Sequence, residues 1–176
     1  MTKKTISLIL GAALCLSLLA ACGTPAADPT PTPTQEPALT GEELAAHYAE
    51  AITSARTDED NQSFTITTAA DELGDYGWES LGFASSDVEA FAVSLSLINV
   101  HAYCVGAFKP VEGKAETVMN GLQAYIDRTV QSVTNYLPDQ LTIAENAVLE
   151  QLDDGTVLIV MCTDQDTVRD AIVAAL

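Results

Sequence analysis

The chain has 176 residues and a formal net charge of −18, because 25 acidic side chains face only 7 basic ones. Such an excess of negative charge repels phosphate groups, so nucleic acid and anionic lipid surfaces are poor partners. Cationic partners and metal ions remain compatible with it.

The first 21 residues have the pattern of a bacterial export signal. Lys3 and Lys4 precede an apolar run over residues 6–21, which is shorter than the roughly 20 apolar residues of a membrane span. Two alanines then lead directly to Cys22, as in lipoprotein signals, where the thiol is lipidated and the chain is cut before it. The alternative is an ordinary signal peptide, but then a small residue would mark the cleavage site. We predict a signal peptide over residues 1–21.

Lipidation at Cys22 makes the lipid bilayer a partner of the chain. A diacylglyceryl or palmitate modification anchors stably, since each buried methylene contributes about 0.8 kcal/mol and two chains act together. The protein is then exported and attached to the outer face of the cytoplasmic membrane. Removal of residues 1–21 leaves 5 basic and 25 acidic residues, a formal charge of −20.

Residues 22–39 are predicted to be a linker. They hold five of the seven prolines, interleaved with threonine and alanine, and nothing in them can pack a core. Extended at about 3.1 Å per residue, the linker reaches up to ~50 Å. Residues 40–176 are long enough for a single globular domain.

The first half of this domain begins with a helix. Thr40 and Glu43 have the spacing of a capping box, and apolar residues recur on one face as far as Arg56. Residues 57–61 are predicted to be a polar turn. Residues 63–68 alternate like a strand, and residues 71–86, with three glycines, are predicted to be irregular or to contain a helical turn.

The sequence of the second half of the domain predicts two successive units, each with the order strand, strand, helix. Residues 93–97 and 100–108 form a hairpin around a tight turn at residues 98–99, with only one face of the first strand covered. Residues 112–136 have helical periodicity, and Pro138 ends that helix. The second hairpin pairs residues 142–151 with 156–162.

Asp154 and Gly155 suit a type I′ turn in this second hairpin. Such a turn places Gln151 opposite Leu158 and Leu149 opposite Val160. The last helix starts at Thr163 or Asp164, and the residues it is expected to bury are Val168, Ala171, Ile172 and Ala175. The order of elements predicts an α+β fold: a two-layer sandwich with a four-stranded, largely antiparallel sheet, helices packed on it, and an N-terminal helix.

Two cysteines, Cys104 and Cys162, reach the folded domain. Export permits a disulfide between them. Both also sit in apolar, strand-like runs, where a small buried thiol is the alternative.

Several short blocks resemble an uncharacterised family of Gram-positive bacterial lipoproteins that carry a domain of unknown function, of the DUF4358 type. The blocks are residues 87–93, 97–100, 108–109, 135–138 and 145–148. The resemblance runs from about residue 72 to 176 and implies localisation and domain extent, but no catalytic residues. Similar proteins often have an acidic residue near position 104, so Cys104 departs from the family pattern. This departure weakens the case for a disulfide.

The sequence contains no serine-hydrolase elbow, phosphate loop, dinucleotide fingerprint or zinc-protease motif. His101 and Cys104 lie three residues apart, which places them on opposite faces of a strand. His47 is expected to be a solvated residue at the edge of the first helix. Three acidic stretches (58–61, 71–75 and 164–166) offer oxygen ligands, but none matches a calcium loop, so no metal or cofactor is predicted.

Two functional hypotheses remain open at this stage. The first is a non-enzymatic binding or interaction module for an unknown component of the cell envelope. The alternative is an enzyme or ligand-binding accessory protein that acts on an extracellular small molecule or glycan, using acids such as Asp71, Glu72 or Asp75. A sugar-binding surface is also open, formed by Tyr103, Tyr125 and Tyr136.

Overall fold

The computed structural model describes residues 39–98 and 100–176. These residues group into one unit with its own core. The predictions for residues 1–38, including the signal peptide, Cys22 and most of the linker, lie outside the described residues. The elements are α1 (Gly41–Ala55), α2 (Asp58–Ser63), α3 (Ala70–Leu81), the 3-10 turn η1 (Ser85–Asp87), β1 (Val88–Leu95), β2 (Cys104–Pro110), α4 (Ala115–Val133), α5 (Pro138–Glu145), β3 (Val148–Gln151), β4 (Val157–Met161) and α6 (Gln165–Ala175).

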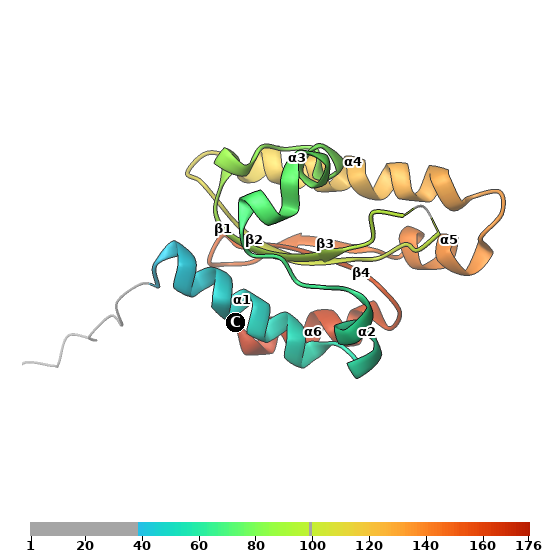
Figure 1. Ribbon diagram of the computed structural model, residues 1–176, viewed down its shortest axis with the longest axis horizontal. Helices are drawn as coiled ribbons and strands as arrows, with labels where there is room; N and C mark the ends of the chain where they lie inside the picture. Colours follow the sequence, from blue (N-terminus) through green and yellow to red (C-terminus); the bar gives the residue numbers. More distant parts are fainter. Residues whose placement is uncertain (1–38, 99) are drawn as a thin grey trace, which may run out of the picture. The chain divides into compact units, whose positions relative to one another are not determined.

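The four strands form one antiparallel sheet in the order β1-β2-β4-β3. The predicted α+β fold, with a four-stranded antiparallel sheet, helices packed on it and an N-terminal helix, is therefore confirmed. The number of layers differs from the prediction. Helices cover both faces, with α3, α4 and α5 on one side and α1 and α6 on the other, so the sheet is the middle of three layers (Figure 1).

Each face of the sheet has its own hydrophobic core. Phe108, Ile159 and Met161 point toward α4, whereas Val105 and Val160 point toward α1 and α6. Every residue of the central strand β4 is apolar, because both faces of this strand are buried. The prediction that the first strand has only one covered face is wrong, since Val93 and Ser94 are both fully buried.

The two long helices follow their predicted patterns. Thr40 and Glu43 form the expected capping box of α1, and Arg56 is its C-cap. In α4 the apolar residues at helical spacing lie against the sheet. In α6 only Val168 and Ile172 are buried; Ala171 and Ala175 are exposed, so that part of the prediction is wrong.

The short helices were not predicted. Residues 58–63 form α2 rather than a turn, because the Thr57 hydroxyl accepts the Asp60 N–H and three acids favour the positive end of the helix. Pro138 begins α5 instead of only ending α4, so residues 138–145 are helical and the predicted strand starts at Val148.

The segment between α2 and β1 also differs from the prediction. The expected strand over residues 63–68 is reduced to one bridge, in which Thr67 pairs with Val93. The stretch predicted to be irregular or to contain a helical turn is mostly helical, because it contains α3, which is kinked at Gly74. Trp78 is buried, and its indole N–H donates to the Ala70 carbonyl at 3.1 Å.

Both hairpins have longer loops than predicted. β1 begins at Val88 and Leu95 pairs with Cys104, so the tight turn at residues 98–99 is replaced by a loop over 96–103. In the second hairpin Gln151 pairs with Val157 and Leu149 with Ile159, one residue away from the predicted register. The Leu152 N–H donates to the Thr156 carbonyl at 2.8 Å, which leaves three residues, 153–155, in the loop, and of these only Gly155 adopts a positive φ, of 86°.

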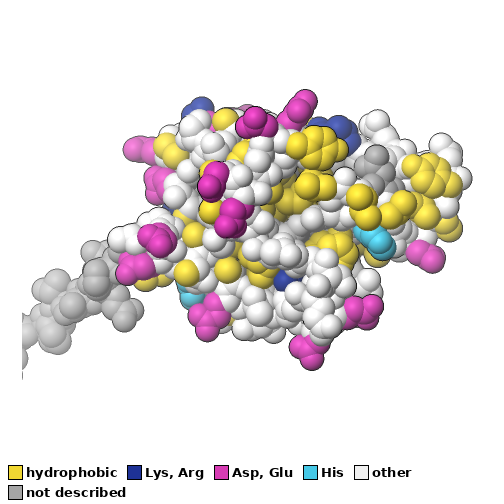
Figure 2. Space-filling view, viewed as in Figure 1, with side chains coloured by type: hydrophobic (Ala, Val, Ile, Leu, Met, Phe, Trp, Pro, Cys, Tyr) yellow, Lys and Arg dark blue, Asp and Glu magenta, His cyan; other side chains and the backbone are white. Residues whose placement is uncertain are grey.

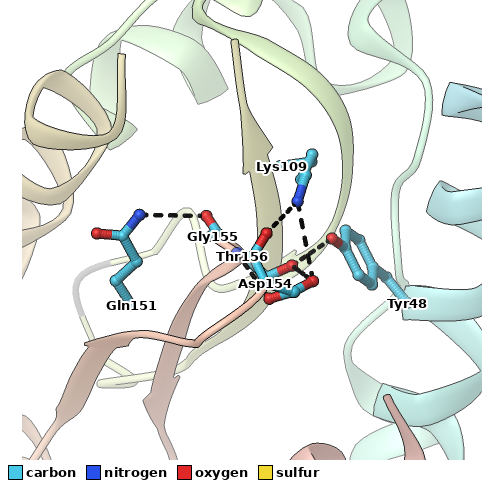
Figure 3. Close-up of polar contacts among 6 residues, drawn as sticks. All are labelled: Tyr48, Lys109, Gln151, Asp154, Gly155 and Thr156. Atoms are coloured by element: carbon cyan, nitrogen blue, oxygen red, sulfur yellow. Dashed lines mark hydrogen bonds and ion pairs between the residues drawn. The ribbon is translucent and has the colours of Figure 1, made fainter. Parts of the chain in front are cut away.

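Side chains around this loop explain its register (Figure 3). The Asp154 carboxylate accepts the Thr156 N–H at 2.9 Å and the Thr156 hydroxyl at 2.6 Å. Tyr48 of α1 bonds to the same Thr156 hydroxyl at 2.7 Å, and Lys109 donates to the Asp154 carbonyl. The turn is thereby fastened to both α1 and β2.

Candidate functional site

The candidate site is a cleft of about 680 Å³ at the end of the sheet where β1 and β4 finish and β2 begins. We call it the end cleft. Four segments form its walls: α2 and the residues beside it, the loop between β1 and β2, α5, and the start of α6. Its lining residues are Ala55, Thr57, Glu59, Asp60, Ser63, Phe64, Ile98, His101, Ala102, Tyr103, Gln140, Ile143, Cys162, Thr163, Asp164, Thr167 and Val168.

Aromatic side chains form one wall of the end cleft. The rings of Phe64 and Tyr103 stack at a centroid distance of 3.8 Å and an interplanar angle of 8°. The His101 ring meets Phe64 edge-on at 6.1 Å. Burial raises the pKa of Tyr103 to about 12, although Arg56 opposes the shift. The phenol therefore stays protonated at neutral pH.

Arg56 lies behind this aromatic wall and fixes it in place. Its guanidinium donates to the Tyr103 hydroxyl at 3.0 Å, to the Phe64 carbonyl at 3.2 Å and to the Ser94 hydroxyl at 2.7 Å. Two further bonds reach the Asn61 side chain at 3.1 and 2.7 Å. One buried cation thus joins α1, α2, β1 and β2 behind the cleft.

Further lining residues come from α5 and from the start of α6. The side-chain carbonyl oxygen of Gln140 accepts the Ala102 N–H at 2.8 Å, which ties the loop after β1 to α5. Asp164 is the only described non-glycine residue with a positive φ, 55°. It precedes α6, yet its side chain makes no capping hydrogen bond, so the carboxylate is not occupied by the helix.

Three carboxylates, those of Glu59, Asp60 and Asp164, line the end cleft. None of the three belongs to an ion pair within 4.0 Å among the described residues. Figure 2 shows acidic side chains spread over the face in view, with apolar side chains gathered toward the end that carries α5 in Figure 1. The end cleft is therefore apolar at its walls and acidic at its edges.

The two cysteines do not form the disulfide that export would permit, and they match the alternative of small buried thiols. Both are buried and free, and they lie on opposite faces of the sheet: Cys104 in the core against α4 and Cys162 in the core against α1 and α6. Burial raises the pKa of both thiols, that of Cys162 to about 12. Cys162 contacts the end cleft as a neutral thiol and not as an activated nucleophile.

The acidic stretches noted in the sequence are separated by the fold. Asp60 from the first stretch and Asp164 from the third both line the end cleft. Asp71, Glu72 and Asp75 are exposed on α3 and do not line it. Over residues 39–98 and 100–176, no group of three or more His, Cys, Asp or Glu side chains is arranged to hold a metal ion.

The remaining sequence candidates do not come together. Tyr103 and Tyr125 are buried while Tyr136 is 62% exposed, so the three do not share a sugar-binding surface. His101 lies in the loop before β2, so it does not share a strand with Cys104. Three further residues of the site, Arg56, Phe64 and Gln140, were not predicted from the sequence. The one signal for Arg56 was the rarity of basic residues in the chain.

A second, smaller hollow of about 270 Å³ lies between α3, α4 and the end of β1, and Tyr76 and Arg128 are among its lining residues. Its hydroxyls are largely committed to the backbone. Ser96, Thr129 and Ser132 each donate to a carbonyl oxygen at 2.8 to 3.1 Å. The end cleft is therefore better equipped than this hollow to bind a ligand.

The fold defines the class of the domain: an α+β domain whose four-stranded antiparallel sheet is covered by helices on both faces. Within the chain, residues 78–162 match the model of a family described as a domain of unknown function (DUF4358). The match covers slightly less than half of the chain, contains the whole sheet with α4 and α5, and is shorter at both ends than the expected 72–176. It supports the predicted uncharacterised domain family. No curated protein and no solved structure matches the chain.

Among the helices that the structure describes, none is both long and apolar enough to cross a membrane.

Proposed function

We propose that this protein is an exported bacterial lipoprotein of the Gram-positive type, anchored through Cys22, and that its domain is a non-enzymatic binding module. The observation that carries the proposal is the end cleft, with apolar walls, a stacked aromatic pair and three carboxylates at its edges. Its volume lies in the range of about 300–1,000 Å³ that is usual for ligand sites. The component bound belongs to the cell envelope or the space outside it.

Binding fits the chemistry of the end cleft better than catalysis does. Burial keeps both Tyr103 and Cys162 protonated, so neither supplies a nucleophile or a base at neutral pH. The side-chain carbonyl oxygen of Gln140 already accepts a hydrogen bond from the Ala102 N–H. The acids offered for the enzymatic alternative lie outside the cleft, on α3.

The anchor is tested by replacing Cys22 with serine in the full chain and following the protein between membrane and medium. The proposal expects the C22S protein to leave the membrane fraction and to lose incorporation of an alkyne-labelled palmitate. Cys15→Ser is the matched control, because position 15 belongs to the segment that is removed. Equal membrane retention and labelling of C22S and C15S would contradict the anchor.

The binding site is tested by photo-crosslinking in living cells. A photoreactive residue at position 98, which is 61% exposed in the end cleft, is compared with one at position 173, which is 39% exposed on α6 and does not line the cleft. We expect a discrete adduct from position 98 that disappears when Thr167→Trp fills the cleft. Adducts that are the same at both positions, or that persist with T167W, would overturn the assignment of the cleft.

A further inference from the structure

The charges of the domain restrict what can occupy the end cleft. Residues 39–176 contain five basic and 23 acidic side chains. Three of the basic residues are in ion pairs, Lys109 with Asp154, Lys114 with Asp87, and Arg169 with Glu150 and Asp170. Arg56 is buried behind the cleft wall. An anionic occupant would therefore enter a negative field with few cations to receive it.

The carboxylates of the end cleft come from two separate segments. Glu59 and Asp60 belong to α2, and Asp164 directly precedes α6. None has an ion-pair partner among the described residues, and the Asp164 carboxylate does not cap its own helix. A positive group bound in the cleft would be attracted by carboxylates from both segments.

The apolar surface is larger than the end cleft itself. Phe64, Tyr103, Ile143 and Val168 supply apolar area within it. Ile98 is 61% exposed at its edge, and Leu97 and Val100 in the same loop are 46% and 51% exposed beyond it. A small ligand held in the cleft would leave this loop uncovered, whereas an extended partner would cover both.

We infer that the end cleft binds a segment of an extracytoplasmic protein that carries basic side chains next to apolar ones. This inference rests on the proposed function and adds the chemistry of the partner. Apolar side chains of the segment pack on the aromatic wall and on Leu97, Ile98 and Val100, and its basic groups pair with Asp60 and Asp164.

Three capped hexapeptides test this inference on residues 39–176. They share the same leucine and phenylalanine residues and carry lysine, glutamine or glutamate at the two other positions. Binding is measured by titration calorimetry, and its location by amide chemical shifts. We expect the lysine peptide to shift residues of the end cleft and to bind about tenfold more tightly than the glutamine peptide at low salt, with the glutamate peptide weakest.

A double variant assigns the charge effect to the cleft. Asp60→Asn with Asp164→Asn should weaken the lysine peptide about fivefold to tenfold and leave the glutamine peptide unchanged. Asparagine tolerates the left-handed conformation of position 164, so D164N removes the charge without new strain. The control is Asp71→Asn with Glu72→Gln, which removes two exposed charges on α3 and should change neither affinity.

The outcomes separate the two proposals. Equal affinity of the lysine and glutamine peptides at the cleft, or equal losses in the two double variants, would overturn the inferred basic partner and leave the binding site in place. Peptides that shift no residue of the cleft, while the adduct at position 98 forms in cells, would overturn the peptide-like partner alone. Loss of that adduct as well would overturn the proposed function.

Discussion

Arg56 shows how a single side chain can join the core to the candidate site. It is 7% exposed, and its hydrogen bonds go to the neutral groups of Asn61, Phe64, Ser94 and Tyr103. A buried cation is stable only when its donors are satisfied, and a guanidinium can satisfy several acceptors at once because its five N–H groups are fixed in a plane.

Replacing Arg56 with methionine should lower the free energy of unfolding by about 1–3 kcal/mol, because buried hydroxyl and carbonyl groups lose their donors. Arg56→Lys should recover only part of the loss, since one ammonium cannot reach all four partners. Urea denaturation measures both. Arg128→Met is the control, an exposed arginine for which a change below about 1 kcal/mol is expected. An R56M protein as stable as the wild type would show that these bonds contribute nothing net.

Asp154 makes the stability of the domain depend on pH. Desolvation opposes its ionisation, but the hydrogen bonds from the Thr156 hydroxyl and N–H outweigh it, with help from Lys109, so the pKa of Asp154 is lowered. A lowered folded-state pKa contributes stability that is complete above the ordinary value of about 4 and is lost as pH falls through the folded-state value.

Wild type should therefore be more stable than Asp154→Asn between about pH 5 and 7, and the difference should narrow below about pH 4. Melting temperatures across this range measure the difference. Asp139→Asn, an exposed residue of α5, serves as the control and should follow the wild-type curve. A difference that stays constant down to about pH 2.5 would show that the carboxylate's charge has no part in the effect.

At the scale of elements, Gly121 sets how closely α4 approaches the segment after α3. A Cβ at this position would lie 2.8 Å from the Leu81 carbonyl oxygen, 2.8 Å from Phe83 Cδ1 and 2.9 Å from the Gly82 carbonyl oxygen. Two of these three neighbours are backbone atoms, which cannot move aside without displacing the segment.

Gly121→Ala should therefore destabilise the domain by about 1–3 kcal/mol, the usual cost of overpacking. The opposite sign holds for an open helical position, where alanine is favoured over glycine by about 1 kcal/mol. Asn120→Ala, at an exposed position of the same helix, should be neutral or slightly stabilising. Denaturant midpoints compare the two variants, and a stabilised G121A protein would show that the close contact is relieved at little cost.

The sequence predicted those elements whose pattern repeats over several turns. α1 and α4 are long enough for their periodicity and caps to define them. α2 and α5 have six and eight residues, too few for a clear period, and both depend on local chemistry at Thr57 and Pro138. The hairpin register was wrong by one residue because Asp154 binds Thr156 and makes a three-residue loop.

The end cleft could not be derived from the sequence, although several of its residues were singled out there. Asp60 stood in one stretch, His101 and Tyr103 in a second, and Cys162 and Asp164 in a third, and no spacing motif connects the three. Their proximity follows from the strand order β1-β2-β4-β3, which brings the end of β4 beside the start of β2. A site assembled from four separate segments is set by topology, which local patterns do not encode.

At the scale of the whole molecule, the dominant feature is the imbalance of 23 acidic against five basic residues over 39–176. Only four ion pairs are formed in the described part of the chain, and Arg169 makes two of them. Most carboxylates therefore repel one another through the solvent, and this repulsion opposes the compact state.

Salt should stabilise this domain. Raising NaCl from about 0.01 M to about 0.3 M shortens the screening length from roughly 30 Å to below 10 Å, so repulsion among the carboxylates weakens more than the few ion pairs do. We expect the melting temperature of residues 39–176 to rise by several degrees. Calcium chloride at the same ionic strength is the comparison: an equal rise indicates screening alone, whereas a much larger rise would indicate a specific cation site. A melting temperature that falls with NaCl would show that the ion pairs of Lys114 and Arg169 stabilise the domain by more than the repulsion among carboxylates destabilises it.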